Sequence, residues 1–204
     1  MMLNVRNFKL VSDQVEYAEL EVIIRELTEV LKRSILGDVV ELGCYSGTTS
    51  LFIQRILQKE VIKRSFHVYD SFSGLPEKTA EDSSPVGVQF TAGQLTASKR
   101  QLISHFNQAR LPLPIIHKSW FEELRSNDMP EAIAFAFLDG DFYRSIKSSL
   151  QVITPRLSAG ATVIIDDYHS EALPGAKQAV AEWVRLHNLE VKPEQSLAII
   201  KWTS

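Results

Sequence analysis

The fold is decided by the stretch Val39-Val40-Glu41-Leu42-Gly43-Cys44-Tyr45-Ser46-Gly47-Thr48-Thr49-Ser50. Its mostly apolar start, 39–42, predicts a buried strand, and an amphipathic helix begins near Thr48. Between them, Gly43 and Gly47 lack a Cβ, so the chain can turn tightly and a ligand can approach its backbone closely. The free N–H groups at the start of the helix point into that turn. The stretch therefore predicts a nucleoside-binding unit, although an ordinary strand-to-helix turn would show the same pattern.

Strands and helices alternate along the rest of the chain. We expect helices over 13–35, 48–59, 94–110, 142–157 and 175–187, strands over 65–69, 114–118, 133–138 and 161–165, and a closing hairpin of 189–191 and 197–202. This alternation predicts an α/β fold with a doubly wound, Rossmann-like sheet, mostly parallel, that ends in an antiparallel hairpin. Residues 1–36 should form a helical segment packed on a core domain of residues 37–204.

The composition excludes several classes of protein. A chain of 204 residues that is 45% hydrophobic suits one α/β domain. Its net charge of −3 gives no electrostatic reason to expect a nucleic acid or an anionic membrane as partner. The single cysteine, Cys44, excludes an internal disulfide, and residues 1–10 lack the apolar core of a signal peptide. We therefore expect a cytoplasmic protein.

Asp70 follows the second predicted strand, at the sheet edge where doubly wound folds bind ligands. A carboxylate there can accept hydrogen bonds from both ribose hydroxyls of a nucleoside. The preceding turn reads Glu41-x-Gly43-x-x-x-Gly47, which has one glycine fewer than the dinucleotide fingerprint G-x-G-x-x-G. This wider turn favours a cofactor with an amino-acid tail, such as S-adenosylmethionine, over a pyrophosphate.

Three further carboxylates, Asp139, Asp166 and Asp167, follow two neighbouring strands. Carboxylates about 5 Å apart repel by roughly 3 kcal/mol per pair, so either some stay protonated or a cation lies between them. All-oxygen ligation indicates Mg²⁺, Mn²⁺ or Ca²⁺ rather than zinc. The alternative is that the acids cap helices, most simply Asp141, which precedes the helix predicted over 142–157.

Two other features leave alternatives open. The segment 71–93 is rich in glycine, proline, serine and acidic residues, and it is either a lid over the cofactor or a disordered stretch. The amphipathic first helix, together with Trp202 near the C-terminus, leaves room for a homodimer face.

Taken together, four ordered motifs resemble the macrocin O-methyltransferase family. They are Val39–Ser50, Tyr69-Asp70-Ser71-Phe72-Ser73-Gly74-Leu75-Pro76, Leu138-Asp139-Gly140-Asp141-Phe142-Tyr143-Arg144-Ser145, and Ile165-Asp166-Asp167-Tyr168 with Pro174-Gly175-Ala176. The resemblance runs from about residue 37 to about residue 185. It implies the class I methyltransferase fold and an S-adenosylmethionine-dependent enzyme, and many members of the family methylate sugar hydroxyls of natural-product glycosides with Mg²⁺.

The resemblance also implies a role for each matched residue. Asp139, Asp166 and Asp167 would hold the metal, and Asp141 would be the general base. Asp70 would hold the ribose of the cofactor. The full cofactor-binding set that we expect is Glu41, Gly43, Tyr45, Ser46, Thr48, Asp70, Ser71, Phe72, Ser119, Trp120 and Asp139.

The function that we expect is metal-dependent transfer of a methyl group from S-adenosylmethionine to a hydroxyl of a small molecule, such as a sugar moiety of a glycosylated natural product. One alternative is a catechol or phenol O-methyltransferase on the same fold class. Another is a non-catalytic module that binds S-adenosylmethionine or a partner. A nicotinamide-dependent dehydrogenase ranks below these because the turn lacks the third glycine.

Overall fold

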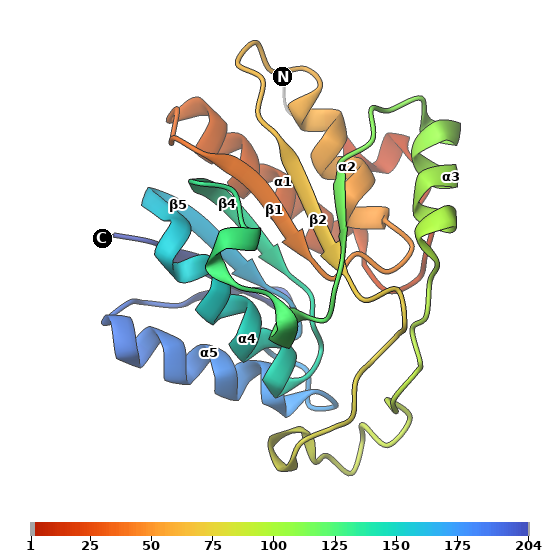
Figure 1. The fold of residues 1–204 in the computed structure, drawn as a ribbon, viewed down its shortest axis with the longest axis vertical. Coiled ribbons are helices and arrows are strands. Elements are labelled where there is room, and N and C mark those ends of the chain that lie inside the picture. The colour runs from red at the N-terminus through yellow and green to blue at the C-terminus, as the bar shows by residue number, and fades with distance from the viewer. Residues whose placement is uncertain (1–2, 204) are drawn as a thin grey trace.

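The computed structural model describes residues 3–203 as a seven-stranded sheet with helices on both faces (Figure 1). The order across the sheet is β3-β2-β1-β4-β5-β7-β6. Strands β1 to β5 are parallel, and β7 pairs antiparallel with both β5 and β6. The strands are β1 (Asp38–Leu42), β2 (Phe66–Asp70), β3 (Ile115–Lys118), β4 (Ile133–Leu138), β5 (Leu157–Ile165), β6 (Lys192–Glu194) and β7 (Leu197–Lys201). Chain order reverses between β1 and β4, which is where doubly wound sheets bind ligands.

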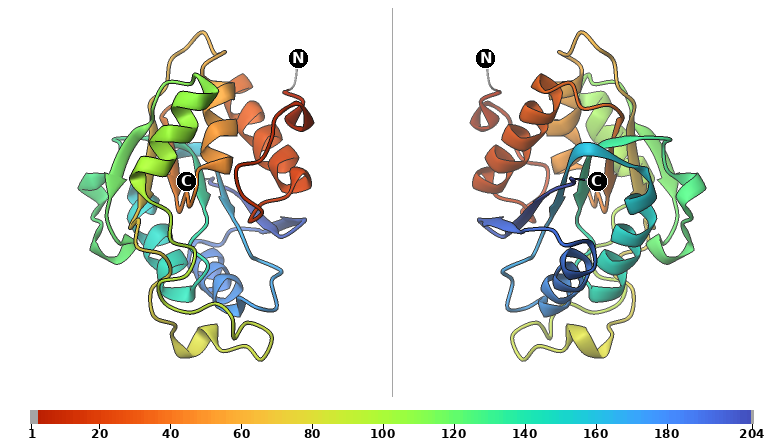
Figure 2. Two further views of the ribbon diagram at one scale, coloured as in Figure 1. Left: turned by 90° about the vertical axis from the view of Figure 1, so that its right-hand side faces the viewer. Right: turned by 90° about the vertical axis from the view of Figure 1, so that its left-hand side faces the viewer.

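The α-helices form the two outer layers. They are α1 (Tyr17–Lys32), α2 (Thr48–Leu57), α3 (Lys99–Ala109), α4 (Tyr143–Ile153) and α5 (Pro174–His187). Apolar residues of α1, α2 and α3 pack on one face of the sheet, and those of α4 and α5 pack on the other (Figure 2). No helix among residues 3–203 combines the length and the apolar character needed to cross a membrane.

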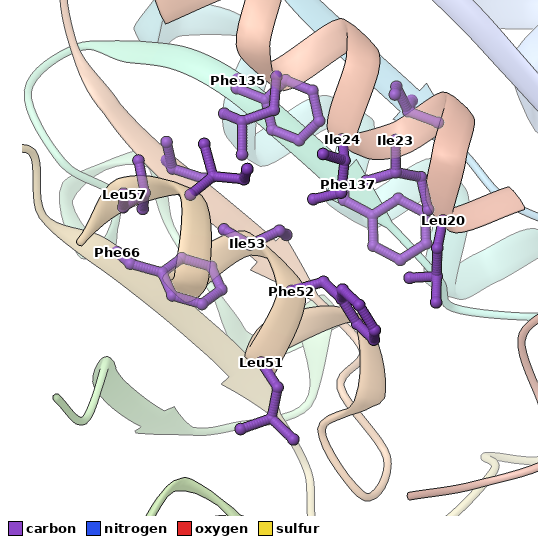
Figure 3. Packing of buried hydrophobic residues seen from close by; sticks show 14 of the residues in the cluster. Leu20, Ile23, Ile24, Leu51, Phe52, Ile53, Leu57, Phe66, Phe135 and Phe137 are labelled. Atoms are coloured by element: carbon purple, nitrogen blue, oxygen red, sulfur yellow. The ribbon is translucent and has the colours of Figure 1, made fainter. Parts of the chain in front are cut away.

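The core is arranged around β4, all of whose residues are buried. Phe135 and Phe137 point to the α1 and α2 side, where they belong to one buried cluster with Leu20 and Ile23 of α1 (Figure 3). The neighbouring residue of β4, Ala136, belongs to the second cluster, with residues of α4 and α5. Because side chains alternate along a strand, a continuous apolar run suits a strand that is covered on both faces.

The mostly parallel sheet and the closing antiparallel hairpin are confirmed, but the predicted strand at 189–191 is wrong. Asn188 adopts a φ of 52° and ends α5, and the Leu189 N–H then donates to the carbonyl of Val184 at 2.9 Å. Leu189 and Val191 pack against the α4–α5 cluster. The hairpin strand therefore starts only at Lys192, after this packed turn.

Several other boundaries also differ from prediction. Helix α1 begins at Tyr17 rather than at residue 13, and α4 ends at Ile153 rather than at residue 157. Helix α3 begins at Lys99, later than the expected residue 94, because the Ser98 hydroxyl oxygen accepts a hydrogen bond from the Gln101 N–H and caps the helix there. Strand β5 begins at Leu157, earlier than the expected residue 161, directly after a 3-10 turn over Thr154–Arg156. The start of α3 is therefore set by a capping bond and the start of β5 by a turn, and the spacing of apolar residues indicates neither.

The long segment between β2 and α3 folds back on itself. The Leu75 N–H donates to the Gln94 carbonyl at 2.8 Å, and the Gly93 N–H donates to the Leu75 carbonyl at 2.9 Å. Leu75 also packs with Phe142 and Leu173, which precede α4 and α5. The segment is therefore a packed wall beside these helices, which argues against the alternative of disorder. It is the yellow-to-green trace below the sheet in Figure 1.

Candidate functional site

Backbone hydrogen bonds align the carboxyl ends of the parallel strands in one row. In this row the donors and acceptors are Ser119 N–H to Asp70 carbonyl (3.0 Å), Gly43 N–H to Tyr69 carbonyl (2.9 Å), Asp139 N–H to Leu42 carbonyl (2.9 Å) and Asp166 N–H to Leu138 carbonyl (2.9 Å). Residues that directly follow β1, β3, β4 and β5 are thus brought to the same sheet edge. This is the arrangement that the strand-end acids predicted.

Gly43 lies where the turn after β1 passes the end of β4. Its φ is 92°, and a Cβ built on it would lie 1.8 Å from the carbonyl oxygen of Asp139. Gly47 has a φ of 93°, but its Cβ would meet only the flexible end of Leu102, at 2.3 Å. The sequence suggested that Gly43 admits a cofactor. The structure adds a second reason for glycine at this position: the backbone carbonyl of Asp139 occupies the space that a Cβ would need.

Asp70 holds the glycine turn in place. Its Oδ2 accepts hydrogen bonds from the N–H groups of Cys44 (2.9 Å) and Tyr45 (3.2 Å), and its Oδ1 accepts one from Phe72 N–H (2.7 Å). A carboxylate has about four acceptor positions, so three backbone donors leave capacity for a ribose hydroxyl. Binding of a ribose by Asp70 stays a prediction.

Asp139, Asp141 and Asp167 form the acidic cluster of the site. Each offers a carboxylate oxygen, and these oxygens all lie within 4.8 Å of one another. Asp141 and Asp167 have φ values of 57° and 59°, in a region that few residues other than glycine adopt. Hard divalent cations prefer such oxygen ligands, so the cluster fits a Mg²⁺ or Ca²⁺ ion. Two predicted ligands, Asp139 and Asp167, belong to it, and its third member is the predicted base, Asp141.

Burial, followed by repulsion between the acids, raises the pKa values at this edge. The pKa of Asp141 rises to about 7 and that of Asp166 to about 6. The pKa values of Asp139 and Asp167 rise well above their ordinary range, with Asp166 as the largest repelling charge on each. A bound cation would offset both the burial and the repulsion.

Asp166 is held by the C-terminal hairpin. Its Oδ1 accepts hydrogen bonds from the Asp167 N–H (2.8 Å) and from the hydroxyl of Ser196 (2.9 Å), which lies between β6 and β7. The Ser196 oxygen also lies 2.5 Å from Oε1 of Glu19, in the first turn of α1. A hydroxyl has one hydrogen, so the two carboxylates share it or one of them is protonated. The hairpin and α1 together therefore support the acidic edge.

A cavity opens at this edge, and most of the predicted site residues line it. Those on its wall are Gly43, Tyr45, Asp70, Ser71, Ser119, Trp120, Asp139, Asp141, Asp166 and Asp167. The glycine turn and the acids thus face one space. It is the kind of concave site, with a few convergent polar groups, that binds small molecules.

The other predicted cofactor residues, Glu41, Ser46, Thr48 and Phe72, do not line the cavity. Glu41 is fully buried, its Oε2 accepts a hydrogen bond from the Ser50 hydroxyl, and its Oε1 has no partner among the described residues. Burial raises the pKa of Glu41 to about 8. The hydroxyl of Thr48 is hydrogen-bonded to that of Ser12 at 2.7 Å. These residues support the turn from behind.

Of the other walls of the cavity, the long loop was anticipated from the sequence as a possible lid over the cofactor, whereas the N-terminal segment and α1 were not identified. The N-terminal segment and α1 contribute Gln14 and Glu19, and the long loop contributes apolar residues. The further lining residues are Gly74, Leu75, Pro76, Phe90, Leu95, Phe121, Glu122, Gly140, Ser145 and Leu173. The spacing of Glu16 and Glu19 does indicate a capped helix start, which the structure contains. No local pattern, however, relates that helix start to a cavity.

Comparison with known proteins places the chain in a family. The family model described as Macrocin-O-methyltransferase (TylF) matches residues 8–203. The chain is 32% identical over 161 residues to 8-demethyl-8-(2,3-dimethoxy-alpha-L-rhamnosyl)-tetracenomycin-C 4'-O-methyltransferase from Streptomyces olivaceus, an alignment that covers 76% of this chain and 60% of the relative. It is 30% identical over 168 residues to mycinamicin III 3''-O-methyltransferase from Micromonospora griseorubida, with 78% and 65% covered. The chain therefore spans less than two thirds of the length of these relatives.

Solved structures confirm the predicted methyltransferase fold. The O-methyltransferase NovP superposes with a TM-score of 0.79 and 25% identity, covering 92% of this chain and 80% of that one. The calicheamicin methyltransferase CalS11 gives a TM-score of 0.73 at 18% identity, covering 93% and 81%. Since the family model spans nearly all of the sequence, the chain belongs to the macrocin-O-methyltransferase (TylF) family.

Proposed function

We propose that this protein is an S-adenosylmethionine-dependent O-methyltransferase that methylates a hydroxyl of a small molecule, and specifically a sugar hydroxyl of a glycosylated natural product. The observation that carries the proposal is the single cavity in which the glycine turn and Asp70 face Asp139, Asp141 and Asp167. Membership of the family supports it. So do the names of the two relatives, both of which specify O-methyl transfer.

The cofactor half of the cavity comprises the turn after β1 and the ends of β2 and β3. S-adenosylmethionine would supply a methyl group carried on a sulfonium. An acceptor oxygen placed in line behind the methyl carbon would form the O–C bond as the C–S bond breaks and S-adenosylhomocysteine leaves. We assign the ribose to the free acceptor capacity of Asp70, and the adenine to the wall formed by Ser119 and Trp120. The backbone at Gly43 and Tyr45 faces the remaining part of the cofactor.

The acidic half comprises the ends of β4 and β5. We assign Asp139, Asp166 and Asp167 as ligands of a Mg²⁺ ion. Asp139 and Asp167 belong to the crowded oxygen cluster, which suits a hard cation, and Asp166 lines the same cavity. Such an ion lowers the pKa of a hydroxyl that it binds. Asp141 accepts the hydroxyl proton in this assignment, since it lines the same cavity as the proposed ligands. Leu75 and other apolar residues of the loop line the same cavity.

The clustering of Asp141 with Asp139 and Asp167 favours a second assignment, in which Asp141 is itself a ligand. Titration of Mg²⁺ into Asp141→Asn and Asp166→Asn distinguishes the two. Loss of Mg²⁺ affinity in Asp166→Asn with retention in Asp141→Asn supports Asp141 as the base. The reverse pattern makes Asp141 a ligand.

The proposed function is tested by following radiolabelled methyl groups from S-adenosylmethionine to a panel of sugar and catechol acceptors. We expect transfer to a sugar hydroxyl, its loss with a chelator and its recovery with Mg²⁺. Transfer to catechols but not to sugars would support the phenolic alternative. Chelator-insensitive transfer would contradict the metal, and thermal stabilisation by S-adenosylmethionine without transfer to any acceptor would support a binding module.

A further inference from the structure

Asp82 is a fully buried carboxylate in the long loop between β2 and α3, outside the predicted site. Its Oδ2 accepts hydrogen bonds from the backbone N–H (2.8 Å) and the hydroxyl (2.9 Å) of Thr79. Its Oδ1 accepts a hydrogen bond from the backbone N–H of Tyr143, at 2.7 Å. One side chain of the loop is thus bound to the first residue of α4.

The first N–H groups of α4 need a hydrogen-bond acceptor from outside the helix. Its N-cap residue, Phe142, makes no side-chain capping bond, and the first N–H groups of a helix have no acceptor within the helix. Asp82 supplies an acceptor and a negative charge from across the fold, where both stabilise a helix N-terminus. The alternative from sequence, in which Asp141 caps this helix, is not what the structure shows, because Asp82 accepts the Tyr143 N–H.

Asp141 lies directly before this capped start. It adopts a φ of 57°, and the Phe142 N–H donates to the Gly140 carbonyl at 2.6 Å, which closes a tight turn. The Phe142 side chain is fully buried and packs with Leu75 of the loop. On its C-terminal side Asp141 is therefore held by two anchors, the Phe142 ring and the capped Tyr143 N–H, and the loop contributes to both.

Gly175, in the first turn of α5, leaves the space that Asp82 occupies. A Cβ at this position would lie 1.9 Å from Oδ1 of Asp82 and 2.8 Å from both N and Cβ of Tyr143. The loop, α4 and α5 thus meet at one carboxylate. The position of Asp82 can consequently be perturbed from α5 without changing Asp82 itself.

We propose that Asp82 is a positioning residue, which fixes the loop to the start of α4 and thereby fixes Asp141 in the cavity. The role of Asp141 in the reaction rests on the proposed function, whereas the anchoring of the loop and of α4 does not. Asp82 touches no cavity-lining acid in the structure and acts through the Tyr143 backbone.

The anchoring is tested by amide hydrogen exchange on the full chain, with no cofactor required. An asparagine side chain has one acceptor oxygen, so Asp82→Asn must lose the bonds of either Oδ1 or Oδ2. We expect at least tenfold faster exchange in peptides covering 140–150 and 74–95, with α2 unchanged. Gly175→Ala, which crowds Asp82, should give the same pattern. Unchanged exchange in both variants would overturn the proposal.

Two matched variants control for generic effects. Glu131→Gln removes an exposed carboxylate at the opposite edge of the sheet, and Arg185→Gln changes an exposed position of α5. Neither substitution should alter the rate of amide hydrogen exchange in peptides covering residues 140–150. Acceleration there in the controls equal to that in Asp82→Asn would show that the effect is not specific to the anchor, and would contradict the proposal.

The effect on Asp141 is tested by steady-state kinetics at a temperature where every variant is folded. We expect Asp82→Asn and Gly175→Ala to lower kcat at least tenfold while KM for S-adenosylmethionine changes less than threefold. A merely structural role would lower Tm and leave the kcat of the folded enzyme unchanged, and that result would overturn the positioning of Asp141. Absence of methyl transfer in the wild type would instead contradict the proposed function, while the exchange experiment would still decide the anchoring.

Discussion

The two halves of the cavity are built in different ways. In the cofactor half, the turn after β1 is held by one carboxylate, Asp70, at the end of the adjacent strand. In the acidic half, the residues after β4 and β5 are supported by Glu19, Asp82 and Ser196, from three distant parts of the chain. The turn of the cofactor half is therefore fixed by a single neighbouring strand end, whereas the acidic half is fixed by contacts from α1, the long loop and the hairpin.

Gly43 joins the two halves, so its substitution should have the largest effect. A Cβ at Gly43 would lie 1.8 Å from backbone of Asp139, at a φ of 92°. We expect Gly43→Ala to cost more than about 4 kcal/mol of unfolding free energy, because backbone of both halves must shift. Urea unfolding followed by circular dichroism measures this.

Gly93 provides the matched control, because its φ is 81° but no atom lies within 4 Å of its Cβ position. Gly93→Ala should cost only the backbone strain, about 1 kcal/mol. Equal costs for the two substitutions would show that the close crossing of the turn and β4 does not matter.

Substitution of Asp141 should disable the acidic half while sparing the cofactor half. We expect Asp141→Asn to lower kcat on the order of 10³-fold, the range typical of a lost general base. Binding of S-adenosylmethionine, measured by isothermal titration, should stay within threefold of the wild type. Undiminished turnover would refute the assignment of Asp141 to the reaction.

Sequence reasoning succeeded where the position of a residue follows directly from strand order. The glycine turn, Asp70 and the acids after β4 and β5 were predicted because parallel strands place their carboxyl ends at one edge. Asp82 and Ser196 were not predicted, because neither directly follows a parallel strand. Asp82 bonds Tyr143 from the long loop, and Ser196 bonds Asp166 and Glu19 from the hairpin. No periodicity or spacing links such positions, and only the packed fold brings them together.

Buried Glu41, behind the turn of the cofactor half, should make the free energy of unfolding depend on pH. Its folded-state pKa of about 8 lies above the ordinary value of 4.5, so the folded protein retains a proton that the unfolded chain releases. This contribution is fully present below pH 4.5 and is lost as pH rises toward 8. Glu41→Gln should therefore be more stable than the wild type at pH 7, by about 2–3 kcal/mol. Urea unfolding at pH 5 and pH 7.5 measures the difference, which should grow with pH; a constant difference would contradict a buried, neutral Glu41.

The smallest effect is expected where α1 meets the hairpin behind the acidic half. Arg25 donates to both carboxylate oxygens of Glu194, at 2.7 and 2.8 Å, and lowers the pKa of Glu194 to about 2. Glu194→Gln should cost below about 1 kcal/mol at pH 7, because the Glu194 side chain is 29% exposed. The stabilisation is present above pH 4.5 and is lost as pH falls toward 2. A cost that persists at pH 2 would show that charge is not its origin.

The central claim is that the cofactor half binds the cofactor independently of the acidic half. It is tested most directly by titrating S-adenosylhomocysteine into one variant of each half by calorimetry. Asp70→Ala removes the acceptor of three backbone N–H groups and should weaken binding about 100-fold, since a hydrogen bond to a charged group contributes about 1.5–3 kcal/mol. Asp167→Asn changes the acidic half and should bind within threefold of the wild type. Unchanged binding by Asp70→Ala, or an equal loss of binding in Asp167→Asn, would contradict this difference between the two halves.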